Sequence, residues 1–126
     1  MTVKSVTEKS PQYQHNHALG RAGEDRAIAL YEERGYTILA HNVSYMFGEL
    51  DFIAEREGVT VFVEVKTRTT PQWGGAEAVT DHKLRKMRRC ANAWLSGRPY
   101  GAIRFDVVEV VANSITVYEG IDGGAQ

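Results

Sequence analysis

Two carboxylates and a lysine occupy neighbouring β-type segments of this 126-residue chain. If Glu57-Gly58 forms a two-residue hairpin turn, Asp51 lies directly opposite Glu64, and Lys66 follows on the same face. Cross-strand neighbours have Cβ atoms about 5 Å apart. Two ionised carboxylates at that distance repel by about 3 kcal/mol at an effective dielectric constant of about 20. Lys66 relieves part of this repulsion, and a hard divalent cation such as Mg²⁺ would relieve more.

The apolar residues of the same hairpin favour this register. Side chains alternate along a strand, so one face is expected to be an apolar wall and the other to concentrate charge. The expected wall is formed by Leu50, Phe52, Ala54, Val59, Val61, Val63 and Val65. An ordinary solvated hairpin face, with Lys66 paired to Glu64, is the alternative explanation of the charged residues.

Length and composition indicate one globular domain with a formal net charge of −1. The domain is expected to span residues 17–120, with a disordered lead-in at 1–16 and a flexible tail at 121–126. No apolar run is long enough to cross a membrane, and no signal peptide is recognisable. A single cysteine, Cys90, excludes an internal disulfide and fits the cytoplasm, and it is expected to pack within a helix.

The order of predicted elements indicates an α/β sandwich with a central mixed sheet flanked by helices. Two helices are expected at about 17–34 and 80–96. Strands are expected at 36–42, 48–56, 59–67, 102–111 and 114–119, with Asn113-Ser114 forming the last turn.

The first helix carries a carboxylate in an apolar setting. Glu24 shares a helical face with Ala27, Ile28 and Tyr31. Gly23 and its neighbour Gly20 permit a close approach of this helix to another element, although glycine costs helix stability. Glu24 is expected either to lean over the sheet toward Asp51 or to pair with a cation at the helix edge, and the helix by itself does not decide between these.

The second helix is locally basic in a chain of near-zero net charge. Clustered cations of this kind are expected where a protein binds phosphate backbones. A solvated helix surface is the alternative. The candidate nucleic-acid-binding residues are Lys83, Lys86, Arg88 and Arg89 on the helix and Arg68 in the preceding segment.

Five short segments stand out in a fixed order along the chain. They are 20–24 (GRAGE), 48–53 (GELDFI), 62–68 (FVEVKTR), 77–80 (EAVT) with Lys83, and 104–108 (RFDVV). Together they resemble the PD-(D/E)XK nuclease superfamily, which has the restriction-endonuclease-like fold. More closely, they resemble the small, uncharacterised YraN-like bacterial family within it. One departure is that Leu50 stands where the superfamily name has a proline.

The resemblance implies that Asp51 and Glu64 are metal ligands for Mg²⁺ or Mn²⁺ and that Lys66 is the third signature residue. It also implies that Glu24 is an accessory acid and that Lys83 belongs to the helix following the core strands. The activity inferred from the superfamily is metal-dependent hydrolysis of phosphodiester bonds.

Two other functions are compatible with the sequence. One is a non-catalytic nucleic-acid-binding module on the same fold, and the other is a protein-interaction scaffold. DNA is favoured over RNA as the nucleic acid, and the chain could act alone or as a homodimer. Retention of Asp51, Glu64 and Lys66 together favours chemistry, because binding alone disfavours acids beside phosphate.

Overall fold

The computed structural model describes residues 11–68, 81–99 and 101–121, with side chains described from residue 21 onward. Every element predicted from the sequence is present and in the predicted order. The elements are α1 (Pro11–Glu33), β1 (Thr37–Tyr45), β2 (Gly48–Arg56), β3 (Val59–Arg68), α2 (Asp81–Leu95), β4 (Ala102–Val111) and β5 (Ser114–Tyr118). None of the described helices is long and apolar enough to cross a membrane.

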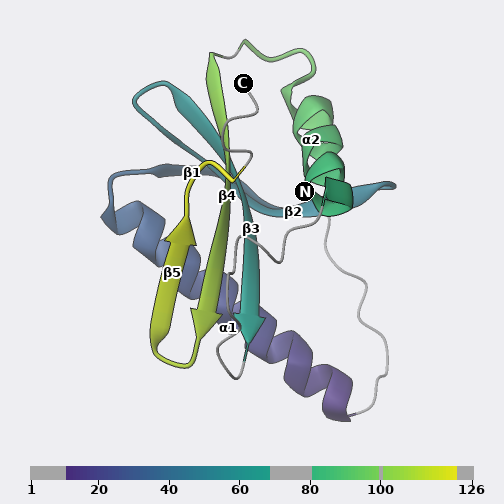
Figure 1. The fold of residues 1–126 in the computed structure, drawn as a ribbon, viewed down its shortest axis with the longest axis vertical. Coiled ribbons are helices and arrows are strands. Elements are labelled where there is room, and N and C mark those ends of the chain that lie inside the picture. Colours follow the sequence, from purple (N-terminus) through teal and green to yellow (C-terminus); the bar gives the residue numbers. More distant parts are fainter. Residues whose placement is uncertain (1–10, 69–80, 100, 122–126) are drawn as a thin grey trace.

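The five strands form one mixed sheet in the order β1-β2-β3-β4-β5. Neighbouring strands are antiparallel except for β3 and β4, which are parallel and joined through α2. A parallel pair requires such a crossover connection. Helix α1 crosses one face of the sheet, and α2 lies against β2 on the other (Figure 1). The predicted α/β sandwich is confirmed.

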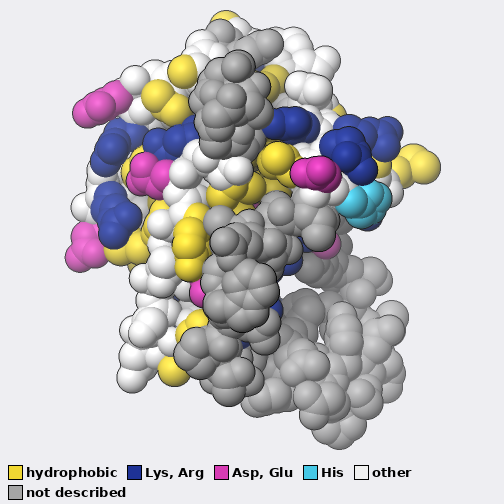
Figure 2. Space-filling view, in the orientation of Figure 1, with side chains coloured by type: hydrophobic (Ala, Val, Ile, Leu, Met, Phe, Trp, Pro, Cys, Tyr) yellow, Lys and Arg dark blue, Asp and Glu magenta, His cyan; other side chains and the backbone are white. Residues whose placement is uncertain are grey.

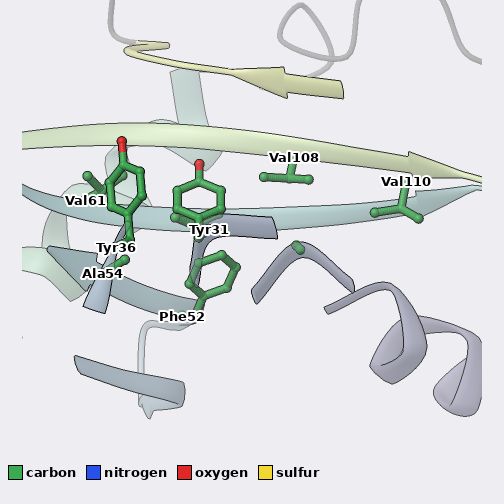
Figure 3. Packing of buried hydrophobic residues seen from close by; sticks show 9 residues of the cluster. Tyr31, Tyr36, Phe52, Ala54, Val61, Val108 and Val110 are labelled. Carbon is green, nitrogen blue, oxygen red and sulfur yellow. The ribbon is translucent and has the colours of Figure 1, made fainter. Parts of the chain in front are cut away.

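Each helix covers a separate hydrophobic cluster. On the α1 side, the ring of Tyr31 lies 5.1 Å from that of Phe52 and 4.8 Å from that of Tyr36 (Figure 3). On the other side, Met87, Cys90, Ala91 and Leu95 of α2 pack against the sheet. Cys90 is fully buried, which confirms its predicted packing role.

A buried polar network ties the end of α1 to the sheet. Asp106 of β4 is fully buried and accepts a hydrogen bond of 2.6 Å from the Tyr31 hydroxyl. Its other oxygen accepts bonds from Arg104 Nε at 2.9 Å and from the main-chain N–H of Gly120 at 3.1 Å. Burial and the neighbouring Asp106 raise the pKa of Tyr31 far above its usual range. The network therefore joins α1, β4 and the segment after β5.

The hairpin between β2 and β3 has the predicted turn and register. Glu57 and Gly58 both have positive φ, at 53° and 82°, as a type I′ turn requires. The Glu55 carboxylate accepts a hydrogen bond of 2.9 Å from the Gly58 N–H, which stabilises a turn that lacks the favoured Asn-Gly. Arg56 pairs with Val59 as predicted.

Three boundaries differ from the predictions. Helix α1 begins at Pro11, so residues 11–16 are helical instead of a disordered lead-in. Proline is favoured in the first helical turn, where its missing N–H has no helical partner to lose. Strand β1 continues to Tyr45. The last turn is Ala112-Asn113, with Ala112 at a φ of 50°, and Ser114 already belongs to β5. Residues 1–10 and 122–126 lie outside the described residues.

Gly23 lies where α1 packs tightly against Thr67 at the end of β3. A Cβ atom at this position would meet Oγ1 of Thr67 at 2.1 Å and Cβ of Thr67 at 3.3 Å. The predicted close approach of the first helix is therefore correct at Gly23. The adjacent residue is Glu24, so the same contact sets how near that carboxylate comes to the sheet.

Replacing Gly23 by alanine should destabilise the fold. Without a steric conflict, alanine would favour the helix by about 1 kcal/mol. Overpacking against Thr67 should outweigh that gain and lower the free energy of unfolding by about 1 to 3 kcal/mol. Urea unfolding measures the change, and the double variant Gly23→Ala/Thr67→Ala should recover part of it. A single variant more stable than the natural protein would contradict the contact.

Candidate active site

Asp51 lies at an irregularity of β2. The ladder between β2 and β3 ends at the pair Phe52–Val63, one pair short of the predicted Asp51–Glu64 position. On the other side, Asn42 of β1 has a φ of 54° and is absent from the β1–β2 register. The Asp51 carboxylate accepts a hydrogen bond of 2.6 Å from the Val65 N–H. This side chain therefore takes the place of a main-chain partner at the end of the ladder.

The irregularity also changes which face Leu50 occupies. The sequence predicts Leu50 beside Phe52 and Ala54, but Leu50 packs on the α2 side with Ile53 and Phe62. That prediction is wrong because the break at Asp51 shifts the alternation of side chains between Leu50 and Phe52. Ile53 and Phe62 lie on the opposite face from Phe52 and Ala54, as strand alternation predicts, and α2 buries both of them.

Three carboxylates from three elements meet at this break. The side chains of Asp51 on β2 and Glu64 on β3 are both buried, with only 8 % of each residue exposed. Glu24 of α1 lies within hydrogen-bonding reach of Asp51. Burial, followed by the charge of Glu64 and the proximity of Glu24, raises the pKa of Asp51 to about 8 against the opposing effect of the Val65 N–H. Glu24 thus leans toward the sheet, the first of its two expected arrangements.

Two lysines balance this charge. Nζ of Lys66 lies 3.6 Å from Oε2 of Glu64, and Nζ of Lys83 lies 2.9 Å from the same oxygen. Burial lowers the pKa of Lys83, but the Glu64 and Asp51 carboxylates outweigh burial and raise it overall. Lys83, predicted with the nucleic-acid-binding residues, therefore contacts Glu64 directly. We refer to Glu24, Asp51, Glu64, Lys66 and Lys83 as the acidic cluster.

The carboxylate oxygens of the acidic cluster suit a hard cation that keeps several water ligands. They do not suit a metal whose ligands are all supplied by the protein. Within the described ranges, no three Asp, Glu, His or Cys side chains converge as ligands of one ion. Mg²⁺ commonly uses only one or two carboxylates and completes its shell with water and phosphate oxygens. Asp51 and Glu64 match that requirement, whereas a structural zinc site needs four nitrogen or sulfur ligands.

The other predicted basic residues have different surroundings. Nε of Arg68 lies 2.9 Å from Oε2 of the buried Glu109. The Arg68 guanidinium is therefore paired with a carboxylate of β4. On α2, the Arg89 guanidinium lies 4.2 Å from the centroid of the Phe47 ring, Lys86 is exposed, and Arg88 is partly buried. Basic side chains gather at the edge of the molecule where α2 lies (Figure 2). Lys86 and Arg89 are thus the predicted binding residues most open to a ligand.

A surface hollow beside Glu24 brings together several residues that the sequence analysis did not propose for the site. This hollow between α1 and β1 is lined by Arg21, Glu24, His41 and Asn42, among others. The left-handed conformation of Asn42 has a weak sequence signal, because asparagine tolerates positive φ better than most residues. Nothing local indicates that Arg21 and His41 share this hollow, since they lie on different elements.

Replacing Asp51 by asparagine should stabilise the metal-free protein in a pH-dependent way. The folded chain keeps a proton on Asp51 up to about pH 8, whereas an unfolded chain releases it near the ordinary value of 3.8. The contribution of Asp51 to stability is therefore full below that ordinary value and is lost as the pH rises to about 8. The gain in Tm of Asp51→Asn should grow over this interval and level off above it.

Thermal unfolding in a chelator between pH 4 and 9 measures this gain. Glu33→Gln, which changes an exposed carboxylate of α1, is the matched control and should show no such trend. A gain in Tm for Asp51→Asn that does not vary with pH would contradict the assigned environment.

Comparison with known sequences agrees with the family resemblance. Residues 23–110 match the model of the uncharacterised protein family UPF0102. A UPF0102 protein of Corynebacterium efficiens is 51% identical over 115 residues, covering 86% of this chain and 94% of the relative. A UPF0102 protein of Corynebacterium diphtheriae is 46% identical over 117 residues, covering 88% and 96%. A UPF0102 protein of Mycobacterium sp. (strain KMS) is 48% identical over 98 residues, covering 74% and 73%. The chain belongs to the uncharacterised protein family UPF0102.

Proposed function

We propose that this protein is a PD-(D/E)XK-type nuclease that hydrolyses phosphodiester bonds with Mg²⁺ or Mn²⁺ held by Asp51 and Glu64. The observation that carries the proposal is the burial of these two neighbouring carboxylates, with Lys66 and Lys83 paired to Glu64. Burying adjacent acids opposes folding, because desolvation and mutual repulsion both disfavour the charged forms. A bound cation would offset this unfavourable free energy, because it would neutralise both carboxylates. The two buried acids are therefore explained by a metal-binding site.

The position of Asp51 suits a metal ligand. Its Oδ2 atom is held by the Val65 N–H at 2.6 Å, which restricts rotation of the carboxyl group. Loss of its proton on metal binding completes a pair of negative ligands with Glu64. When bound, the cation polarises the scissile phosphate and lowers the pKa of a coordinated water.

The remaining members of the acidic cluster have distinct roles in the proposal. Lys66 lies two residues from Glu64 on the same strand, where it orients the attacking water or stabilises the charge of the pentavalent phosphorane. Lys83 keeps the Glu64 carboxylate in place through its 2.9 Å ion pair. Glu24, beside Asp51, orients a water molecule next to the ligand pair.

Helix α2 would place the substrate backbone over this cluster. Its first turns carry Lys83 in the cluster and Lys86 on the exposed surface, so phosphate groups bound along the helix would pass the acids. Contacts of lysine and arginine with phosphates position a nucleic acid without reading its bases. The substrate proposed on these grounds is nucleic acid recognised by its backbone, and DNA is favoured over RNA.

Cleavage should require both Asp51 and Lys66. Asp51→Asn removes a metal ligand with little change in shape, and Lys66→Ala removes the group that acts on water or the transition state. Each should reduce cleavage by about 100-fold or more, which is about 2.7 kcal/mol of transition-state stabilisation. The assay is a panel of labelled single-stranded, duplex and branched DNA and RNA with Mg²⁺ or Mn²⁺.

Two controls make the cleavage assay decisive. Glu33→Gln should cleave as the natural chain does, and Mn²⁺ binding by equilibrium dialysis should be lost in Asp51→Asn but kept in Lys66→Ala. Equal cleavage by every variant would reveal a contaminating nuclease. Binding without cleavage across the panel would favour the non-catalytic module. Absence of both metal and nucleic-acid binding would favour the protein-interaction scaffold.

Neutralising the basic helix should weaken nucleic-acid binding similarly for all sequences. In the triple variant Lys86→Gln/Arg88→Gln/Arg89→Gln, the salt dependence of the binding constant should flatten by up to about one unit of slope for each lost phosphate contact. Fluorescence anisotropy at several salt concentrations measures the slope. Arg34→Gln, which changes an exposed arginine at the end of α1, is the control. Unchanged binding by a folded triple variant would show that the basic residues of α2 form an ordinary solvated surface and do not bind nucleic acid.

A further inference from the structure

The end of the β1–β2 hairpin presents an apolar side chain to solvent. We define the hairpin tip as Tyr45, Met46 and Phe47. Met46 is completely exposed, with a relative accessibility of 104%. The rings of Tyr45 and Phe47 on either side of it stack, with centroids 5.5 Å apart and planes 7° from parallel. Figure 2 shows a hydrophobic side chain protruding beyond basic ones at the edge where Figure 1 places this hairpin beside α2.

The hairpin tip is held against α2. The guanidinium of Arg89 lies 4.2 Å from the centroid of the Phe47 ring. A Cβ atom on Gly48 would lie 3.4 Å from Sγ of the buried Cys90 and 3.8 Å from Cβ of Lys86. Gly48 also has a φ of 153°, a conformation that favours glycine. These contacts fix Phe47 and Gly48 against α2, so the exposed Met46 side chain projects from a segment that is held in place.

Helix α2 connects the hairpin tip to the acidic cluster. Lys83 contacts Glu64, and Arg89, six residues further along the helix, contacts the tip. At about 1.5 Å per residue, six residues correspond to roughly 9 Å along the helix axis. Stacked nucleotides rise about 3.4 Å each, so that distance corresponds to about three nucleotides.

The size and surroundings of the tip favour a nucleic-acid base as its partner. One methionine between two mutually stacked rings offers far less area than the roughly 1,200 Å² of a stable protein–protein interface. The adjacent Lys86 and Arg89 provide positive charge beside an apolar surface. A base with its attached phosphate offers the complementary pair, an apolar face next to a negative charge.

We propose that Met46 stacks on, or inserts beside, an unpaired base a few nucleotides from the bond aligned with the acidic cluster. This inference rests on the proposed nuclease function and narrows its substrate to nucleic acids that expose bases beside a duplex. Tyr45 and Phe47 support Met46, and Arg89 holds the tip while it neutralises a neighbouring phosphate.

The test compares a blunt DNA duplex with the same duplex bearing a single-stranded overhang, in a chelator so that no cleavage occurs. Met46→Ser should bind the overhang substrate about fivefold more weakly and the blunt duplex unchanged. With 2-aminopurine at successive overhang positions, the natural chain should raise the emission at one position about twofold, and Met46→Ser should not. Leu39→Ser, which removes another exposed apolar side chain of β1, should behave as the natural chain does.

Three results would overturn the inference. Equal binding and equal 2-aminopurine emission for the natural chain and Met46→Ser would overturn it and leave the proposed function standing. Absence of binding of the natural chain to either substrate would overturn the inference, and absence of binding to the whole nucleic-acid panel with Mg²⁺ or Mn²⁺ would overturn the proposed function as well. A natural dimer that Met46→Ser converts to a monomer in sedimentation, with unchanged nucleic-acid binding, would assign the tip to contact between two copies of the chain.

Discussion

Burial of two adjacent carboxylates is the constraint around which this structure is organised. Asp51 and Glu64 are withdrawn from water at the point where the pairing of β2 and β3 ends. Desolvation and mutual repulsion would make their burial unfavourable unless the surroundings supplied hydrogen-bond donors and cations. Strand β3 supplies the Val65 N–H and Lys66, and α2 supplies Lys83. The compensation comes from separate elements, so it exists only in the folded chain.

The position of α1 is decided by one contact near its middle and another near its C-terminal end. Near its middle, Gly23 brings the helix against Thr67 at the end of β3. Two turns later, Tyr31 donates a hydrogen bond to the buried Asp106 of β4. Glu24 lies between these contacts, and its approach to Asp51 depends on both of them. A glycine and a buried tyrosine outside the acidic cluster thereby help to place one of its side chains.

The sequence alone was sufficient wherever the deciding interactions are local. Alternation and the Glu57-Gly58 turn determine the register of β2 and β3, because a two-residue turn leaves little freedom in pairing. The same hairpin brings Asp51 and Glu64 near each other, although the ladder ends one pair short of them. Helical periodicity places Glu24 on the apolar side of α1. The family follows from motifs with fixed spacing. The hairpin and helix-face inferences each involve residues of one element or of two joined by a tight turn.

Tertiary structure alone decided what depends on residues far apart in the chain. It assigned Lys83 to Glu64 instead of to the outer surface of α2, and it paired Arg68 with Glu109. It also moved Leu50 to the α2 side, because the break in pairing at Asp51 comes from strands on both sides of β2 and from no local signal. Amino-acid type and spacing specify which side chains share an element. Which distant charges meet depends on how the helices dock on the sheet, and that is set by packing and buried hydrogen bonds across the whole domain.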